Sequence, residues 1–346
     1  MATVTENVKA RAAQASRGVL HSLMGVQLVS TGAFVPETVV RNEDLAALGY
    51  DAPWIVQRTG IHQRRHAPPH VATSDLAARA AQRCLAKAGV PASDIDLLLV
   101  ATVTPDTAMP AAACHLQRRL GARAPAMDIN AACSGFVFAL VTAAHYLKNG
   151  FGRLALVVGA DTMSRTVDPA DKRTYPLFGD GAGAVLVGAG DRQQGFVSYT
   201  LGCEGEGTDL LYIAVEGSRE PASAEPRASR RPYLRMAGRA VFKWAVRTVV
   251  DSILDVLCHA GLTPNDLDLV ALHQANRRII EAVVDDLGID RRRVLTNVDR
   301  YGNTSAASIP LVLEEAQAQG RIRRGDLVLI SGFGAGLTWG TAVIRW

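Results

Sequence analysis

Along most of the chain, short apolar runs alternate with longer stretches whose apolar residues recur at helical spacing. The runs at 26–30, 95–101 and 154–159 have the length and continuity of buried β-strands. Residues 74–88 show helical periodicity, start with Ser and Asp and stop at a glycine. Residues 133–149 are apolar nearly all round, which predicts a helix buried at the centre of the protein. Strands alternating with helices predict an α/β fold.

The chain also contains an internal repeat. Residues 88–96 align without gaps with residues 260–268, and an apolar strand follows each copy. Further on, 154–159 aligns with 327–332, and a helix-like stretch ending in Gly precedes each of these strands. The copies are too few and the period too long for a solenoid, so the pattern predicts two similar α/β halves.

The repeat has a chemical consequence. Counting back 17 residues from the glycine that ends each copy's helix gives Cys133 and Asn303, two equivalent helix starts. The same register places His273 where a strand ends, at the position equivalent to Ala101. If the halves pack about a pseudo-two-fold axis, a thiol, an imidazole and a carboxamide converge in one central cleft.

We expect three segments. Residues 1–24 are polar and Ala-rich, lack the apolar core of a signal peptide, and are interpreted as a flexible extension. Residues 25–190 and 191–346 then form the N-terminal and C-terminal halves.

Composition narrows the functional classes. The 346 residues are 48% hydrophobic and 20% charged, which excludes a disordered chain and a coiled coil. No apolar run reaches the roughly 18–20 residues of a membrane span, so we expect no membrane insertion. A net charge of +4 is too small to indicate nucleic-acid binding. The five cysteines are irregularly spaced, which is typical of reduced cytoplasmic thiols and indicates neither a zinc site nor a redox dithiol.

Cys133 is the strongest candidate nucleophile. It lies in Ala-Ala-Cys-Ser-Gly-Phe at the predicted helix start, where free N–H groups should stabilise a thiolate and lower the thiol pKa. The alternative interpretation is one more buried cysteine. The motif is not a Gly-x-Ser-x-Gly elbow, which argues against a serine hydrolase.

Three further motifs accompany the cysteine. His273 follows an apolar strand, a usual place for ligand-binding residues, although a structural histidine fits as well. Asn303 lies in Gly-Asn-Thr-Ser-Ala-Ala-Ser and alone would be interpreted as a helix cap. The Gly-rich segment 332–340 could present N–H groups to an oxyanion, or simply form a tight turn between strands.

Together these motifs resemble the β-ketoacyl-acyl carrier protein synthase III family of the thiolase fold. The resemblance covers about residues 26–346 and rests on the order and spacing of its motifs. These are Trp-Ile-Val-Gln-Arg-Thr-Gly-Ile at 54–61, the cysteine motif, Phe-Gly-Asp-Gly-Ala-Gly at 178–183, Met-Ala-Gly at 236–238, His-Gln-Ala-Asn at 273–276, Gly-Asn-Thr-Ser-Ala-Ala-Ser at 302–308 and the C-terminal glycine turn. The family implies a five-layered α/β fold built from two similar halves, and a homodimer.

The resemblance implies roles for the central residues. Cys133 would accept the acyl group, and His273 and Asn303 would complete the catalytic triad. The backbone N–H groups of Cys133 and Ala335 would form an oxyanion hole. A thiolase needs a second cysteine in the C-terminal glycine motif, and this motif has none. Chain-elongating synthases use two histidines, whereas this chain has Asn303 at the second position.

The resemblance also implies residues for coenzyme A. Trp54 and Arg58 match residues that hold the adenine, and Thr59 and Arg165 match others around the nucleotide end. Phe242 matches a residue that lines the pantetheine tunnel. The alternative interpretation of each arginine is a solvated surface charge.

The resemblance also implies residues that contact partners around the edge of the site, and the chain differs from the family there at two places. Arg278 matches a basic residue that engages the carrier protein, and Met109 stands where the family closes the acyl pocket across the dimer. Arg239 replaces an Asn common in the family, and 218–235 is a longer loop rich in Pro, Ser and Arg. These departures leave the starter substrate open.

The sequence therefore predicts a cytoplasmic acyltransferase that uses no metal or redox cofactor. Its expected substrates are an acyl-coenzyme A starter and malonyl-acyl carrier protein, which it condenses with loss of carbon dioxide to 3-oxoacyl-acyl carrier protein, initiating fatty acid synthesis. The alternative is a secondary-metabolism homologue that primes a polyketide or transfers the acyl group to another nucleophile. A non-catalytic thiolase-fold subunit is disfavoured by the intact Cys133, His273 and Asn303.

Overall fold

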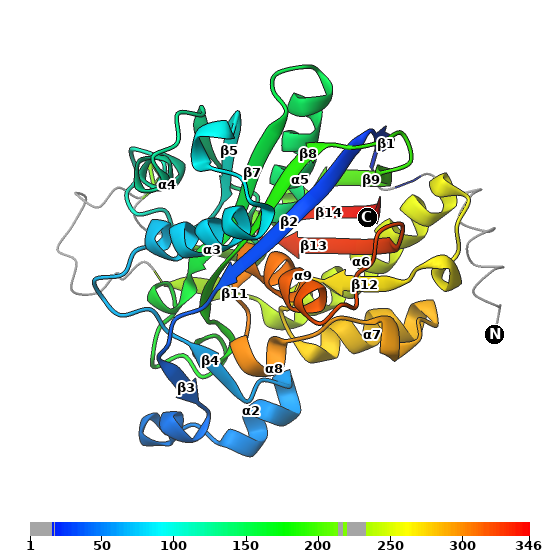
Figure 1. The fold of residues 1–346 in the computed structure, drawn as a ribbon. Helices are drawn as coiled ribbons and strands as arrows, with labels where there is room; N and C mark the ends of the chain where they lie inside the picture. The colour runs from blue at the N-terminus through cyan, green and yellow to red at the C-terminus, as the bar shows by residue number, and fades with distance from the viewer. Residues whose placement is uncertain (1–15, 17, 214–216, 220–232) are drawn as a thin grey trace.

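The computed structural model describes residues 16, 18–213, 217–219 and 233–346, and its strands form two five-stranded mixed sheets (Figure 1). The first sheet has the order β2-β8-β7-β5-β6. Its strands are β2 (Val26–Phe34), β5 (Leu97–Ala101), β6 (Ala126–Ile129), β7 (Leu154–Thr162) and β8 (Asp180–Ala189). The second sheet has the order β1-β9-β14-β13-β12. Its strands are β1 (Leu20–Met24), β9 (Gly195–Cys203), β12 (Leu269–Leu272), β13 (Leu327–Gly334) and β14 (Thr338–Arg345).

The two sheets share a topology. In the first, β5 and β7 are parallel, while β8 and β2 continue antiparallel. In the second, β12 and β13 are parallel, while β14 and β9 continue antiparallel. The predicted strands at 26–30 and 154–159 are confirmed within β2 and β7, and the one at 95–101 is confirmed as β5, which begins two residues later, at Leu97.

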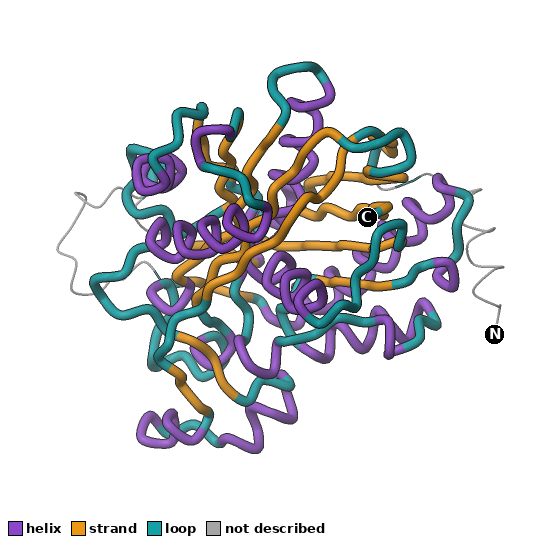
Figure 2. Tube along the Cα trace, in the orientation of Figure 1, coloured by secondary structure: helices purple, strands orange, loops and turns teal. Residues whose placement is uncertain are grey.

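Helices complete five layers, α-β-α-β-α, which confirms the expected thiolase-like architecture (Figure 2). The central helices, α5 (Gly135–Lys148) and α9 (Ser308–Ala318), pack between the sheets in one core with strands of both. The first sheet is covered outside by α3 (Thr73–Ala88) and α4 (Ala112–Leu120). The second is covered by α6 (Gly238–Ala260) and α7 (Arg277–Leu287). No helix among the described residues is long and apolar enough to cross a membrane.

Smaller elements surround these layers. The remaining helices are α2 (Ala52–Thr59) and α8 (Val298–Tyr301), and the two small hairpins pair β3 (Val39–Arg41) with β4 (Gln63–Arg65) and β10 (Leu211–Ile213) with β11 (Leu234–Met236). The 3₁₀ turns are η1 (Glu43–Leu48), η2 (Ala92–Asp94), η3 (Ala132–Ser134), η4 (Met163–Arg165), η5 (Tyr175–Leu177), η6 (Gly205–Leu210), η8 (Pro264–Asp266), η9 (Arg291–Arg293) and η10 (Ser305–Ala307).

The prediction that residues 1–24 form a separate flexible extension is wrong for its last five residues. Leu20–Met24 forms β1, which pairs antiparallel with β9 and is an edge strand of the second sheet. Its hydrophobic residues alternate weakly, so the local pattern gave no strand signal; the neighbouring strand supplies the hydrogen bonds. Residues 1–15 and 17, and most of the loop at 218–235, lie outside the described residues.

The predicted equivalence of Cys133 and Asn303 is off by three residues. The turns η3 and η10 begin 173 positions apart, at Ala132 and Ser305, and these two residues share an unusual positive φ of 48° and 52°. Helix α9 has 11 residues where α5 has 14, so counting back from the helix ends shifts the register. The structural counterpart of Cys133 is Ala306, and Asn303 precedes the turn.

Each of these turns packs against the central strand of the opposite half. A Cβ atom at Gly159 on β7 would lie 2.2 Å from the Ala306 carbonyl oxygen. A Cβ atom at Gly332 on β13 would lie 3.1 Å from the Cα of Ser134. Glycine at both equivalent positions therefore lets the two turns approach each other through the middle of the molecule.

We predict that Gly159→Ala lowers the free energy of unfolding by at least about 1–3 kcal/mol, because the new methyl group meets backbone rather than a movable side chain. Gly205→Ala is the matched control, since its Cβ would meet nothing within 4 Å. That control should stay within about 0.5 kcal/mol of the parent protein. Urea unfolding followed by circular dichroism measures both, and equal stability of the two variants would contradict the packing argument.

Candidate active site

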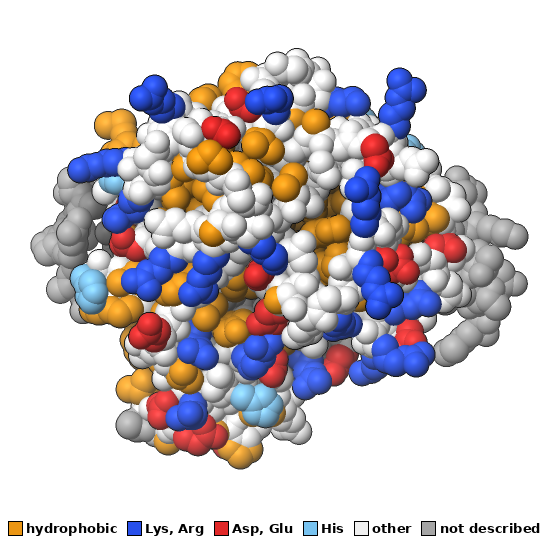
Figure 3. All heavy atoms as spheres, in the orientation of Figure 1, with side chains coloured by type: hydrophobic (Ala, Val, Ile, Leu, Met, Phe, Trp, Pro, Cys, Tyr) orange, Lys and Arg blue, Asp and Glu red, His pale blue; other side chains and the backbone are white. Residues whose placement is uncertain are grey.

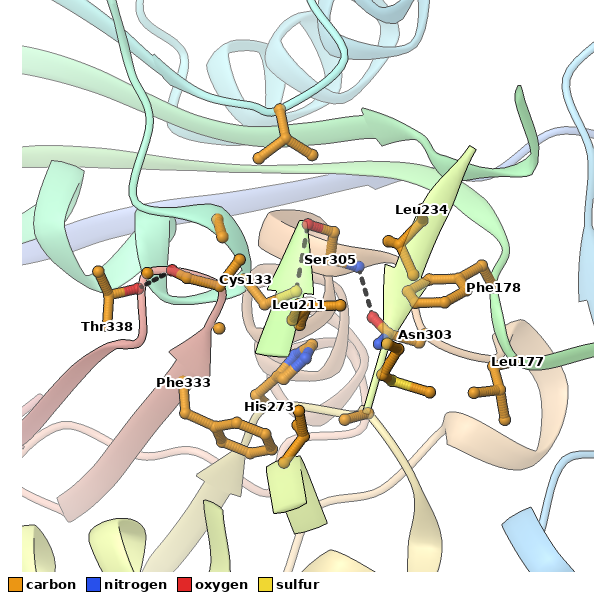
Figure 4. Close-up of a pocket in the computed structure, with 18 of the residues that line it drawn as sticks. Cys133, Leu177, Phe178, Leu211, Leu234, His273, Asn303, Ser305, Phe333 and Thr338 are labelled. Atoms are coloured by element: carbon orange, nitrogen blue, oxygen red, sulfur yellow. Dashed lines mark hydrogen bonds between the residues drawn. The ribbon is translucent and has the colours of Figure 1, made fainter. Parts of the chain in front are cut away.

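A cavity of about 600 Å³ lies where the two halves meet, and Cys133, His273 and Asn303 all line it (Figure 4). They come from η3, the end of β12 and the segment before η10, which are far apart in sequence. Ala335 and Phe242 line the same cavity. The structure therefore brings together five of the residues singled out in the sequence.

Cys133 is a buried, neutral thiol. Its side chain is within hydrogen-bond distance of the Ser305 hydroxyl, at 3.5 Å. The pKa of the Cys133 thiol is raised to about 12. Burial is the largest cause, the Ser305 hydrogen bond opposes it, and the nearby Asp161 adds to it. The expectation that the helix start lowers this pKa is wrong, because loss of hydration outweighs the backbone dipoles.

His273 is a buried imidazole held in one orientation. Its backbone N–H continues the β12–β13 ladder to the Ser331 carbonyl at 2.8 Å. Its ring Nδ1 lies 2.6 Å from the Ser308 hydroxyl, which accepts the Gln274 N–H at 3.4 Å. Burial lowers the pKa of His273 to about 3, so the ring is neutral. With the Ser308 proton donated to Nδ1, Nε2 carries the ring hydrogen and is a donor.

Asn303 has its carboxamide fixed by the backbone. Its Oδ1 accepts the Ser305 N–H at 2.8 Å, as the dashed line in Figure 4 shows. The Asn303 backbone N–H donates to the Leu177 carbonyl at 2.8 Å, and the Asn303 carbonyl accepts the Gly179 N–H at 3.0 Å. Because Oδ1 is occupied, the amide NH₂ is the group available to a ligand.

The glycine-rich turn between β13 and β14 packs directly against Cys133. A Cβ atom at Gly334 would lie 2.6 Å from the Cys133 backbone nitrogen, so only glycine leaves that N–H accessible. Thr338 Oγ1 lies 3.0 Å from the carbonyl oxygens of both Ala131 and Ala335, which ties the turn to η3. The arrangement suits backbone donors that stabilise an oxyanion next to the sulfur.

Two pairs of an arginine with an aromatic ring lie next to Phe242 and Asn276, which line the cavity. The Arg278 guanidinium lies 5.6 Å from the Phe242 ring centroid, and the Arg58 guanidinium lies 5.4 Å from the Trp54 ring centroid. Asn276 caps α7 and donates to the Arg58 carbonyl at 3.3 Å, which links the two pairs. Trp54 is 39% exposed, so its ring remains available for stacking.

Six sequence candidates do not line this cavity: Trp54, Arg58, Thr59, Met109, Arg165 and Arg278. The Thr59 side chain is buried and closes the end of α2, with its hydroxyl donating to Ile55 O at 2.6 Å. Arg165 donates to the carbonyls of three loop residues, the shortest to Val71 at 2.6 Å. The Met109 side chain is 87% exposed.

Sequence reasoning missed the serine residues and one buried acid around the triad. Ser305 and Ser308 were visible in the asparagine motif, but nothing local indicated which side chain each would contact. Asp161 lies within an apolar strand at the interface of the halves and is 0% exposed. An acid in a buried strand was the signal that could have found it.

Two family models match the chain. The model of 3-oxoacyl-[acyl-carrier-protein] synthase III matches residues 127–205, and the model of its C-terminal part matches residues 257–346. These segments contain Cys133 and both other triad candidates.

Relatives match nearly the whole chain. A β-ketoacyl-[acyl-carrier-protein] synthase III of Rhodopirellula baltica is 55% identical over 94% of this chain and 99% of its own. The crystal structure of the synthase III of Thermus thermophilus is 45% identical, with a TM-score of 0.87 over 92% of this chain and 99% of that one. The priming β-ketosynthase of the R1128 polyketide pathway is 35% identical, with a TM-score of 0.87 over 96% of this chain and 98% of that one. On this similarity the chain belongs to the β-ketoacyl-acyl carrier protein synthase III family.

Proposed function

We propose that this chain condenses an acyl-coenzyme A starter with malonyl-acyl carrier protein to give 3-oxoacyl-acyl carrier protein, the reaction that initiates fatty acid synthesis. It is an acyltransferase, as its family is. The observation that carries the assignment is one cavity that is lined by a buried thiol, a neutral imidazole and a fixed carboxamide.

In the first half-reaction, Cys133 attacks the thioester carbonyl of acyl-coenzyme A. The N–H groups of Cys133 and Ala335 stabilise the oxyanion, and a new thioester forms on the sulfur. The thiol proton ends on coenzyme A, which leaves as a thiol.

In the second half-reaction, His273 Nε2–H and the Asn303 amide donate to the thioester oxygen of malonyl-acyl carrier protein. Both donors are neutral and fixed in place, so they stabilise the enolate formed as carbon dioxide leaves without themselves being deprotonated. The enolate carbon attacks the acyl-Cys133 carbonyl, a carbon–carbon bond forms, and the sulfur leaves and is reprotonated. Both half-reactions move electron pairs within thioesters, so the proposed mechanism uses no metal or redox cofactor.

The rim residues complete the proposal. Trp54 and Arg58 are assigned to the adenine of coenzyme A, Thr59 and Arg165 to support of its nucleotide end, and Phe242 to the pantetheine arm. A cytoplasmic homodimer is proposed, in which the exposed Met109 closes the partner's acyl pocket. The similarity to a priming β-ketosynthase keeps a polyketide starter as the second candidate. Intact-protein mass spectrometry with a panel of acyl-coenzyme A thioesters tests the nucleophile and the starter together.

We predict that alkylation of Cys133 by iodoacetamide accelerates about tenfold for each pH unit between pH 7 and 9. The thiolate is the reactive form, and a thiol pKa of about 12 leaves it a small fraction that grows tenfold per unit. Peptide mapping at several pH values measures the rate, with the exposed Cys203 as an internal comparison. A rate for Cys133 that levels off within this window would show that burial does not dominate its pKa.

We predict a division of labour within the triad. His273→Ala and Asn303→Ala should still accumulate acyl-Cys133, but condense at least about a hundredfold more slowly, because each removes one donor to the enolate oxygen. Cys133→Ala should form no acyl adduct while retaining some malonyl decarboxylation. Adduct mass and carbon dioxide release are measured for each variant. If His273→Ala abolishes acylation completely, His273 is instead the obligatory base for the thiol.

We predict that Arg278→Glu slows condensation with malonyl-acyl carrier protein at least about tenfold while leaving acylation by acyl-coenzyme A within about twofold. No carboxylate among the described residues pairs with Arg278, whereas Arg291, Arg292 and Arg300 are paired. On the face in Figure 3, Lys and Arg side chains are interspersed with Asp and Glu. Arg292→Glu is the control. Equal loss of both half-reactions in Arg278→Glu would indicate a structural role.

A further inference from the structure

The two pseudo-equivalent turns differ in what meets their backbone N–H groups. In η10, the Ala306 N–H donates to Asp161 Oδ2 at 3.1 Å. Position 161 on β7 corresponds to Gly334 on β13, because the two strands begin 173 residues apart, at Leu154 and Leu327. Gly334 carries no side chain, and the Cys133 N–H that it faces stays open to a substrate oxyanion. In one half, the Asp161 carboxylate therefore occupies the position next to the turn's N–H group. In the other half, the equivalent position is left empty by Gly334 and is available to a substrate oxyanion.

Asp161 is held by donors on every side. Its Oδ1 accepts Val103 N–H at 2.8 Å, Thr104 N–H at 3.2 Å, and the hydroxyls of Thr102 and Thr104, each at 2.9 Å. Its other side receives Ala306 N–H and a hydrogen bond from the Ser305 hydroxyl. The two threonine hydroxyls each already accept a backbone N–H. Burial raises the pKa of the Asp161 carboxyl, and the hydrogen bonds donated to it by Val103, Ser305, Ala306 and Thr102 lower that pKa. A shell made of donors suits the ionised form of the carboxylate, which only accepts.

The carboxylate reaches the reacting groups through one residue. The Ser305 hydroxyl lies 3.5 Å from Cys133 Sγ, and the Ser305 N–H donates to Asn303 Oδ1 at 2.8 Å. The thiol donates to the hydroxyl, and the hydroxyl donates onward to Asp161. A displacement of η10 would therefore move both the thiol contact and the Asn303 amide.

We propose that Asp161 is a positioning residue for condensation: through Ser305 and Ala306 it holds the Cys133 thiol and the Asn303 carboxamide in their working orientation. This rests on the proposed role of Cys133 as acyl acceptor. Asp161 itself does not contact substrate.

The charge of Asp161 gives the proposal a signature that a purely structural role lacks. The ionisable groups facing the sulfur are Asp161 from β7 and His273 from the end of β12, and His273 is neutral. Asp161 disfavours the thiolate, and it also keeps the Ser305 proton turned away from the sulfur. Removing the charge should ease ionisation of Cys133 while disturbing condensation.

Asp161→Asn, Ser305→Ala and Thr102→Val separate these effects. Asp161→Asn should raise the rate of Cys133 alkylation at pH 8 several-fold, because removing a nearby negative charge lowers the thiol pKa. Its kcat for condensation should fall at least about tenfold with KM little changed. Ser305→Ala should also condense more slowly, because it loses the hydroxyl that links Asp161 to the Cys133 thiol.

Thr102→Val is the matched control, since it removes one donor from Oδ1, the oxygen that does not face η10. It should lower the melting temperature but leave alkylation and condensation within about twofold of the parent. Wild-type condensation in folded Asp161→Asn or Ser305→Ala would overturn the proposal. The proposal would also be overturned if Thr102→Val had the same alkylation and condensation rates as Asp161→Asn. An absent acyl adduct on Cys133 in the parent chain would instead overturn the proposed function.

Discussion

The structure depends on the close approach of two backbone turns through the middle of the molecule. Each turn begins a central helix of one half and packs against the central strand of the other, and the glycines at 159 and 332 make room for this contact. A side chain at either position would separate the halves. The candidate active site is therefore a product of the interface, because residues of both halves line its cavity.

Burial at this interface sets the chemistry of the site. It keeps the Cys133 thiol and the His273 imidazole neutral in the absence of substrate. Neutral groups suit a reaction in which negative charge develops only on the substrate. Fixed N–H donors can then stabilise the oxyanion or enolate of the substrate in a site shielded from water. The serine residues at 305 and 308 fix these donors: one holds the asparagine amide and the other the imidazole.

The duplication explains why the two halves are similar but not interchangeable. The same turn occurs twice, with the same positive φ at its first residue. In one copy the free N–H group faces a glycine and a cavity, and in the other it is satisfied by the carboxylate of Asp161. The same kind of helix start therefore faces the candidate active-site cavity on one side and is held by a buried carboxylate on the other.

The sequence by itself predicted the α/β class, the two halves and the buried central helix, because periodicity and motif spacing can be read along the chain. It also singled out Cys133, His273 and Asn303, which line one cavity. It also placed His273 at a strand end, since the repeat fixes that register. It misplaced Leu20–Met24, whose strand exists only because β9 supplies its hydrogen bonds. It misjudged the Cys133 pKa, because burial is a property of the packed halves. The contacts of Ser305 and Asp161 likewise belong to the tertiary structure alone, since they join segments more than 140 residues apart.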